Sequence, residues 1–594
     1  MDYRIIETGT LVIGSGCAGF NAADWLYDLG EKDVMLITEG VNKGASRNTG
    51  SDKQTYYKLS VAAGEADSID EMTATLFAPG VNGDTALAEA ASSLQSFFKL
   101  VNLGVPFPTN EFGEFVGYKT DHDPRQRATS AGPLTSKLMT EALERSVNKK
   151  GIPVIDGMQA VKIFTDGKKL AGVLAIDLQD QEFVYFKCDN AILATGGPAC
   201  VYHASVYPES QTGMTGMAID AGAELCNFSE WQYGLASMGF RWNVSGTYQQ
   251  VLPRYIDEDG REFLNDYFDD PFEAVDMVFL KGYQWPFDVA KIKGSSRIDM
   301  IVHRETAELG NRVFMDFTKN PSCIENEGFS KLDKVTLDYL QNSGALSGAP
   351  IDRLRIMNTP AIDLYKNNGI DITREPLEIA VCAQHCNGGL AVDANWQTSI
   401  EGLYAAGEAA GTFGSRRPGG SALNSCQVGS MRAARHIAGK ANSNSKLPTD
   451  ELEAFISLAI ATGEKVFREK KSDIQKEMSR CAAHIRDKGA ILALAPVIQN
   501  ELDRVFSYGG DLAELLKYRD MLITDLALLS ALITAGEAFG SRGSALYNDT
   551  PIKDVNLALY TQKTPGGLKS WTAPVRPVPD RDTWFETVWG NYIK

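Results

Sequence analysis

Three glycines near the start of the chain have the spacing that binds a phosphate. Gly14, Gly16 and Gly19 follow the short apolar segment 10–13 and precede 20–29, whose pattern predicts a helix. Gly14 permits a tight turn, Gly16 lets the backbone approach a pyrophosphate, and Gly19 lets helix and strand pack closely. The anion would lie at the helix N-terminus. The residues expected to contact it are Gly14, Gly16, Cys17, Ala18 and Gly19.

An acidic side chain follows where a dinucleotide fold needs one. The apolar segment 34–37 predicts a second strand that ends close to Glu39, 20 residues beyond Gly19. Such a carboxylate accepts hydrogen bonds from ribose hydroxyls. Strand, glycine turn, helix and acid together predict a dinucleotide-binding unit. These residues leave open whether the nucleotide is FAD or NAD.

Length and composition limit the classes of function. With 594 residues, the chain exceeds one hydrophobic core, so we expect two to four structural units. Its 44% hydrophobic and 23% charged content is that of a globular enzyme, without the bias of disordered chains. The net charge of -18 excludes nucleic acid as the expected partner, because phosphates require clustered Lys and Arg.

We expect neither a targeting signal nor a membrane-spanning segment in this chain. Its first strand begins after the polar residues 1–4, which leaves no room for a secretory signal. The apolar stretches 490–495 and 526–535 fall short of the roughly 18 residues that span a bilayer. We therefore expect no membrane span.

The cysteines indicate a reduced compartment. Nine cysteines without a repeated spacing fit neither a disulfide framework nor an iron-sulfur run, so cytoplasm is the simplest location. Cys382, His385 and Cys386 lie within five residues on a predicted strand and would point to opposite faces. We therefore expect no metal site.

Two later strands narrow the choice of nucleotide. The strand 190–194 ends in Ala194, Thr195 and Gly196, and the strand 403–406 ends in Gly407 and Glu408. Both endings resemble later motifs of FAD-binding oxidoreductases. Because a strand precedes only one G-x-G-x-x-G motif, a separate NAD domain is not expected.

From about residue 11 to 547 the chain resembles the flavoprotein subunit of the fumarate reductase and succinate dehydrogenase family, which includes L-aspartate oxidase. The motifs occur in the family's order at 259–263, 387–390, 402–408, 417–423 and 541–543. The resemblance implies an α/β fold: a Rossmann-like FAD domain of the glutathione-reductase type, an inserted α+β capping domain and a C-terminal helical domain. The implied boundaries are 1–230 and 360–440 for the FAD domain, 231–359 for the capping and substrate domain, 448–545 for the helical domain, and 546–594 for an irregular tail.

The resemblance also implies how FAD is held. The helix after Gly420 would direct its N-terminus at the negatively charged edge of the reduced flavin, and Glu408 resembles the acid that binds the ribityl chain. Many membrane-bound relatives bond FAD to a histidine, but 44–53 contains none, so we expect non-covalent FAD. Further expected contacts are Ser46, Asn48, Thr49, Ser421, Ala422 and Leu423.

The implied substrate residues are arginines that bind carboxylates or donate a proton, with histidines beside them. Arg417 matches the arginine before the Gly-Gly pair and could bind a carboxylate bidentately. The proton-donating arginine is expected near 295–305, where Arg297 and Arg304 are candidates and Arg304 is preferred. His385 could serve as an acid or as a ligand.

The pocket departs from the family at its histidines. The family's Gln-x-His-Pro-Thr reads Gln232-Tyr233-Gly234-Leu235-Ala236, and His385 is shifted by one position. The prediction of a simple four-carbon dicarboxylate as substrate is therefore weakened, and a larger or less charged acceptor becomes an alternative. The tyrosines expected near such a pocket are Tyr233, Tyr248 and Tyr255.

These observations favour an FAD-dependent oxidoreductase that reduces a C=C bond next to a carboxylate or carbonyl in a small-molecule substrate. One alternative is an amino-acid oxidase resembling L-aspartate oxidase. Another is an electron-transfer or adenylylsulfate-reductase-like flavoprotein subunit with an iron-sulfur partner. Because no heme or iron-sulfur ligand set is recognised in the sequence, we expect electrons to arrive from a separate carrier, a partner subunit or free reduced flavin. The sequence leaves the substrate, the direction of reaction and the oligomeric state open.

Overall fold

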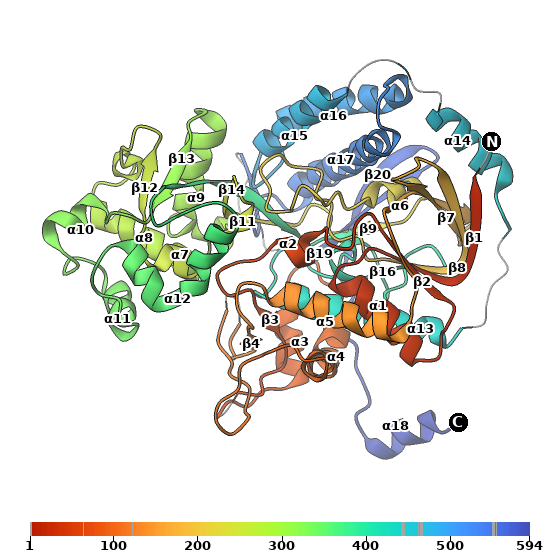
Figure 1. Ribbon diagram of the computed structural model, residues 1–594, viewed down its shortest axis with the longest axis horizontal. Helices are drawn as coiled ribbons and strands as arrows, with labels where there is room; N and C mark the ends of the chain where they lie inside the picture. The colour runs from red at the N-terminus through yellow and green to blue at the C-terminus, as the bar shows by residue number, and fades with distance from the viewer. Residues whose placement is uncertain are drawn as a thin grey trace.

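A parallel sheet forms the centre of the structure, a computed structural model that describes residues 3–62, 64–120, 123–440, 446–460, 463, 467–548, 553 and 555–594. Its strand order is β5-β2-β1-β8-β7-β6, with β16 also paired to β8 (Figure 1). Strands β5, β2, β1, β8 and β16 run parallel, whereas β7 pairs antiparallel with both β8 and β6. The strands are β1 (Arg4–Ile13), β2 (Val34–Thr38), β5 (Val154–Asp156), β6 (Met158–Asp166), β7 (Lys169–Asp177), β8 (Phe183–Leu193) and β16 (Leu403–Ala405).

Helices cover this sheet and bury its apolar residues. Helix α1 (Cys17–Asp28) follows β1, and its face carrying Phe20, Ala23 and Leu26 is fully buried. Because both faces of a parallel sheet are covered, β1 and β8 are continuous apolar runs at their carboxyl ends. The α/β fold predicted for this unit is confirmed. The other helices here are α2 (Ala45–Asn48), α3 (Ile69–Leu76), α4 (Gly83–Asn102), α5 (Thr135–Lys150), α6 (Thr215–Asp220) and α13 (Ser421–Ala438).

A second unit lies to the left in Figure 1 and is built on an antiparallel sheet of order β11-β10-β14-β13-β12. Its strands are β10 (Trp231–Ser237), β11 (Trp242–Asn243), β12 (Arg254–Asp257), β13 (Val313–Asp316) and β14 (Leu377–Cys386). Strand β14 lies beyond the expected boundary at residue 359, because this sheet needs it between β10 and β13. The helices of this capping unit are α7 (Thr247–Gln250), α8 (Pro271–Tyr283), α9 (Ser296–His303), α10 (Ser322–Glu327), α11 (Lys334–Asn342) and α12 (Pro350–Asn367).

The third region is helical. It contains α14 (Thr449–Ile460), α15 (Arg468–Cys481), α16 (Lys488–Asp503) and α17 (Leu512–Ala538). Within the described residues, only α17 is long and apolar enough to cross a membrane, and 67% of its most apolar window is buried inside the fold. Lys517, Asp520 and Asp525 of this helix are also buried, so it is a core helix of this region.

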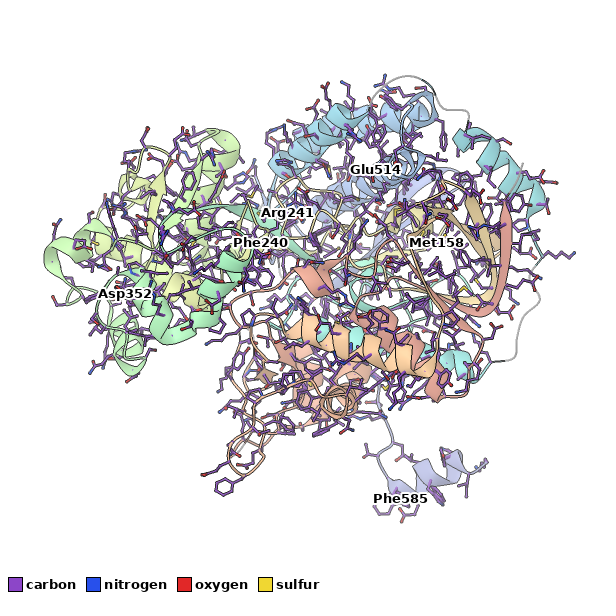
Figure 2. The ribbon with its side chains drawn as sticks, in the orientation of Figure 1. Met158, Phe240, Arg241, Asp352, Glu514 and Phe585 are labelled. Atoms are coloured by element: carbon purple, nitrogen blue, oxygen red, sulfur yellow. The ribbon has the colours of Figure 1, made fainter. Side chains whose placement is uncertain are left out.

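The C-terminal segment is more ordered than the irregular tail expected from its prolines. Strands β19 (Leu557–Thr564) and β20 (Gly567–Pro574) form a hairpin that pairs with β9 (Leu225–Cys226), which in turn pairs with β15 (Gly389–Leu390). Residues 557–564 contain no proline, Pro565 lies in the hairpin turn, and the later prolines lie at or beyond the end of β20, so the ladder keeps its backbone donors. Helix α18 (Phe585–Tyr592) projects away from the body, with Phe585 exposed (Figure 2). The remaining short strands are β3 (Tyr56–Tyr57), β4 (Ala128–Thr129), β17 (Ile485–Arg486) and β18 (Leu546–Tyr547).

Candidate active site

Two adjoining cavities lie at the carboxyl ends of the parallel strands. The first, which we call the nucleotide cavity, measures about 150 Å³ and is lined by the glycine turn and the ends of β2, β8 and β16. The second, the outer cavity, measures about 750 Å³ and lies between the central sheet unit and the capping unit. Ala45, Ser46, Glu408 and Cys426 line both. In open α/β sheets ligands bind at this edge.

The glycine turn between β1 and α1 has no room for side chains. Gly14 adopts φ +108°, and a Cβ there would lie 2.4 Å from the Ala194 carbonyl oxygen. A Cβ on Gly19 would lie 1.8 Å from the Gly14 carbonyl oxygen, so Gly19 serves the packing of the turn against α1. Gly14, Gly16 and Ala18 line the nucleotide cavity. This cradle fits a dinucleotide pyrophosphate.

Two predicted cofactor residues shape the walls instead of lining either cavity. The Cys17 thiol lies 2.9 Å from the Thr140 hydroxyl in the core, where burial raises the pKa of the thiol, and the Cys17 N–H donates to Ser46 Oγ at 3.1 Å. The Asn48 amide donates to the carbonyls of Asn42 and Gly44, at 2.9 and 3.0 Å. Each polar group already has a partner within the protein, so neither residue is placed to bind the nucleotide directly.

Glu39 lines the nucleotide cavity just after β2, with two lysines that the sequence did not indicate. Its carboxylate lines the nucleotide cavity and forms ion pairs with Lys517 of α17 and, at 3.3 Å, with Lys43. Gln211 also lines this cavity and accepts the Ala45 N–H at 2.7 Å. Lys517 and Gln211 are distant from the fingerprint in sequence, and no local pattern marks them.

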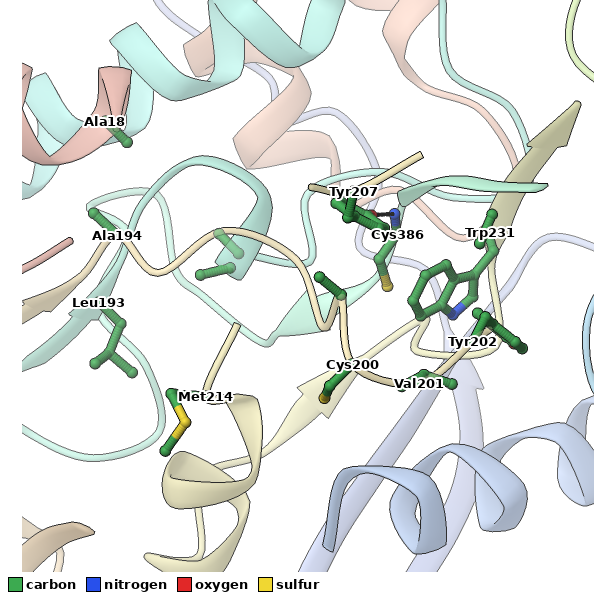
Figure 3. Close-up of a cluster of buried hydrophobic side chains, with 14 of the residues drawn as sticks. Ala18, Leu193, Ala194, Cys200, Val201, Tyr202, Tyr207, Met214, Trp231 and Cys386 are labelled. Carbon is green, nitrogen blue, oxygen red and sulfur yellow. Dashed lines mark hydrogen bonds between the residues drawn. The ribbon is translucent and has the colours of Figure 1, made fainter. Parts of the chain in front are cut away.

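Glu408 lies at the junction of the two cavities. One carboxylate oxygen accepts a hydrogen bond from the Tyr207 hydroxyl and another from the Cys386 N–H, the latter at 2.8 Å. Figure 3 shows Tyr207 facing the backbone of Cys386. Burial raises the pKa of Glu408 to about 7. The predicted residues Ala194, Thr195, Gly196 and Gly407 line the nucleotide cavity beside it.

The start of α13 borders the outer cavity. Gly420 adopts φ +88°, and a Cβ there would lie 2.4 Å from Thr55 Cγ2, which explains a glycine before this helix. Ala422 and Leu423 line the cavity, whereas the buried Ser421 hydroxyl donates to the Pro418 carbonyl at 2.8 Å. The positive end of the helix dipole therefore faces the cavity. Ser46 and Thr49, from the segment 44–53, also line the outer cavity.

Arg417 places a guanidinium group in the lining of the outer cavity. It donates to Gln232 Oε1 from Nε at 3.0 Å and from Nη2 at 2.5 Å, and it has no carboxylate ion pair within the described residues. Burial lowers the pKa of Arg417 to about 10, so it stays protonated at neutral pH. A charged guanidinium without a carboxylate partner can bind a ligand anion.

His385 lines the same cavity in its neutral form. Its Nδ1 lies 3.1 Å from the side-chain oxygen of Asn387. Burial, and secondarily the charge of Arg417, lowers the pKa of His385 well below its usual range. At neutral pH the ring is therefore an uncharged hydrogen-bonding group.

The two arginines proposed as proton donors lie elsewhere. Arg304 is exposed after the end of α9 and packs on the Tyr267 ring, and Arg297 pairs with Glu273 at 3.5 Å. Neither lines the outer cavity, which corrects the expectation. The two positions are seven residues apart and share one helical face. Of the apolar residues of α9, Ile298, Ile301 and Val302 are buried.

The tyrosines of the outer cavity also differ from those expected. Tyr233, Tyr248 and Tyr255 are buried in the core, with hydroxyls bonded to Tyr202, the Ala361 carbonyl and Gln249. The cavity is lined instead by Tyr118, Tyr207, Tyr283 and Tyr339, together with Trp285 and five glutamines. These residues come from separate loops and helices, so no sequence spacing could have identified them as a group.

Comparison with known proteins agrees with this geometry. Residues 9–423 match the model of the family described as "FAD binding domain". A fumarate reductase (CoM/CoB) subunit from Methanothermobacter marburgensis is 26% identical over 93% of this chain and 96% of its own. The L-aspartate oxidase of Mycobacterium leprae is 23% identical, covering 91% of this chain and 92% of its own.

A solved structure shares the architecture. The E. coli quinol fumarate reductase chain superimposes with a TM-score of 0.72 at 17% identity, covering 97% of this chain and 98% of that one. This likeness concerns the fold, and the family match concerns the cofactor. The glycine cradle, Glu39, Glu408 and the start of α13 are the residues that fit FAD. The chain belongs to the FAD-binding domain family and is an FAD-dependent oxidoreductase.

Proposed function

We propose that this flavoprotein reduces a C=C bond next to a carboxylate or carbonyl. The observation that carries the proposal is Arg417, a cation without a carboxylate partner that lines the outer cavity beside the start of α13. When bound, reduced FAD would supply a hydride through its N5, and the reduction would also take up one proton from solvent. Arg417 would bind the substrate carboxylate and thereby fix the position of the adjacent double bond.

The remaining residues support this role by hydrogen bonding and charge. The start of α13 provides a positive dipole end for the flavin edge, and neutral His385 can hydrogen-bond a carboxylate or carbonyl oxygen. We assign His385 as a residue that hydrogen-bonds the substrate, and not as a proton donor, because burial strongly favours the neutral form of its ring. With Arg297 and Arg304 outside the cavity lining, neither supports a role as proton donor.

We also propose that the FAD is held non-covalently. Segment 44–53 contains no histidine, and His385 is the one histidine among the described lining residues of either cavity. Denaturing the protein with acid should release the flavin into the supernatant. Flavin that stays with the precipitated protein would contradict the proposal.

A separate electron carrier is part of the proposal. The relative from Methanothermobacter marburgensis is named as a subunit, so a partner protein with an iron-sulfur centre is one candidate donor. In the described part of the chain, no group of His, Cys, Asp and Glu could hold a metal ion. With nine free cysteines, we place this exchange in the reducing cytoplasm.

The test is anaerobic reoxidation of the chemically reduced holoenzyme. We expect at least one acid with a conjugated C=C bond to restore the oxidised flavin spectrum faster than buffer. If none of a panel of enoates and enones does so, the proposed function is wrong.

The second candidate is an amino-acid oxidase, which the likeness to L-aspartate oxidase supports. It predicts aerobic peroxide formation with amino acids. Peroxide production with L-aspartate, without reoxidation by any enoate, would select this candidate over the first.

A further inference from the structure

The amides of Gln232 and Gln384 in the outer cavity have fixed orientations. Gln232 Oε1 accepts from Arg417, and Gln384 Oε1 accepts from Trp285 Nε1 at 3.1 Å. Arginine and the indole N–H only donate hydrogen bonds, so each glutamine must present its oxygen to that partner. The NH₂ end of each amide therefore points away from that partner.

Neither NH₂ group is used inside the described protein. Gln384 Nε2 is buried without a hydrogen-bond partner, and no bond is formed by Gln232 Nε2 among the described residues. An unsatisfied buried donor destabilises the unliganded protein. Gln384 Nε2 lies over Gly234 beside the Trp285 ring, and a ligand oxygen that accepts from it would remove this penalty.

A β-bulge brings Gln384 to the cavity. Gln232 on β10 pairs with His385 on β14, but the next residue, Tyr233, pairs with Ala383, so Gln384 is the extra residue. Consecutive residues of a regular strand face opposite sides, yet Gln384 and His385 both line the outer cavity. Bulges commonly redirect side chains beside active sites.

The charges of the lining favour one carboxylate in the interior. Arg417 is half-buried, whereas the other two cationic side chains of the lining, Lys53 and Lys119, are exposed. The lining also carries the carboxyl groups of Asp52 and Glu408, so the second charge of a small dicarboxylate would find no further buried cation in the described lining, and burying an unpaired carboxylate is costly.

The remaining wall suits a planar, uncharged group. The rings of Tyr283 and Tyr339 lie 5.4 Å apart and share the lining with Trp285 and Tyr118. Aromatic walls of this kind bury apolar ligand surface, with a few polar groups to orient the ligand.

We propose that Gln232 and Gln384 form a donor pair beside Arg417, and that the substrate is a mono-acid with an aromatic-sized, uncharged body. This inference rests on the proposed reduction of a conjugated C=C bond. It names the acrylic acids that carry an aryl group as the substrate class, in preference to small dicarboxylates.

Binding is tested on the oxidised holoenzyme with saturated acids, which need no turnover. We expect 3-phenylpropionate to perturb the flavin spectrum with a dissociation constant at least about tenfold below those of succinate and butyrate. Equal or tighter binding of succinate, or no binding of 3-phenylpropionate, would overturn the inference.

Reactivity separates this inference from the proposed function. Reduced enzyme should be reoxidised by cinnamate at least about tenfold faster than by fumarate or crotonate. If fumarate is faster, the substrate class is wrong and the reductase function stands. If 3-phenylpropionate binds selectively but no enoate reoxidises the flavin, the reductase function is wrong and the assigned binding site stands.

Variants test the named residues. Gln384→Glu replaces a donor with a carboxylate and should weaken 3-phenylpropionate by more than about tenfold, and Gln384→Met should weaken it as well. The control Gln179→Glu, on an exposed turn, carries the same charge change and should bind normally. Retained FAD absorbance verifies folding of each variant. Normal binding by both Gln384 variants would overturn the assignment.

The aromatic wall has its own variant. The half-exposed Tyr283 has no hydroxyl hydrogen bond among the described contacts, so Tyr283→Leu removes mainly the ring. It should reduce the preference for 3-phenylpropionate over butyrate by about threefold or more. An unchanged preference would contradict the role of this wall.

Discussion

The nucleotide cavity and the outer cavity recognise their ligands in different ways. The nucleotide cavity is built mainly from backbone and glycines at the ends of parallel strands, with Gly14 and Gly19 fixed by contacts of 2.4 and 1.8 Å that a Cβ would make. The outer cavity is built from side chains of two units that meet, such as Arg417 with Gln232. Backbone recognition tolerates little substitution, whereas side-chain recognition can change while the fold stays the same.

This difference explains how one fold serves several substrates. The cofactor half depends on the course of the main chain, which the parallel sheet fixes. In the outer cavity, one bulge at Gln384 and the choice of amides over charged groups alter the ligand that fits. Mutations in the nucleotide cavity should therefore reduce FAD binding, whereas mutations in the outer cavity should reduce reaction with the substrate.

The largest effect is expected at Gly14. Gly14→Ala would place a Cβ 2.4 Å from the Ala194 carbonyl oxygen at a φ of +108°, so we expect loss of FAD or of soluble protein. The measurement is the flavin-to-protein absorbance ratio after purification. Gly30→Ala is the matched control, since Gly30 has φ +103° but open space around its Cβ position. A full complement of FAD in Gly14→Ala would refute backbone recognition.

Arg417→Ala should give the next largest effect, and here the reaction rate should fall while FAD stays bound. Loss of the guanidinium should lower the rate of reoxidation by the preferred enoate by about 100-fold or more, with the FAD content unchanged. Arg304→Ala removes the same charge from an exposed position outside the cavity and should keep the rate within about twofold. Loss of FAD in Arg417→Ala would instead assign Arg417 to the cofactor.

A smaller effect is expected at Asp52, which joins the two units. Its buried carboxylate accepts from the Thr247 N–H at 2.9 Å and from the Thr247 hydroxyl at 3.0 Å. Asp52→Ala leaves these donors unsatisfied and should cost about 1–3 kcal/mol, seen as a lower unfolding midpoint and faster proteolysis of the capping unit. Asp52→Asn keeps an accepting oxygen and should be milder. Equal behaviour of the two variants would argue against a role for these hydrogen bonds.

The smallest effect concerns Asp520 of α17, which accepts the Met217 N–H at 2.7 Å behind the nucleotide cavity. Burial raises the pKa of Asp520 to about 7 from 3.8, so the folded state keeps a proton that the unfolded state loses. Its contribution to stability is present below about pH 4 and is lost as pH rises through 7. Asp520→Asn should therefore gain in unfolding midpoint relative to the wild type as pH rises from 4 to 8. A pH-independent difference would contradict this assignment.

The predictions made from the sequence also differ between the nucleotide cavity and the outer cavity. The fingerprint from Gly14 to Glu39 predicted the dinucleotide-binding fold, because strand, turn and helix are contiguous and each glycine has a steric reason. The later strand endings at 194–196 and 407–408 indicated FAD. Placement of Arg417 and His385 in the cavity was also expected, since both adjoin glycine motifs. Arg297 and Arg304 were misplaced because the pattern of α9 does not reveal which face its neighbours bury.

By itself, the sequence determined a Rossmann-like nucleotide unit and an arginine before a glycine-led helix. Only the tertiary structure decided which side chains share the outer cavity, that a bulge brings Gln384 beside His385, and that Lys517 meets Glu39 from a helix 478 residues away. The physical reason is the separation along the sequence of the residues that must come into contact. Glycine turns and helix starts are set by steric contacts within a few residues, whereas a cavity between units depends on strand register and packing that join distant segments.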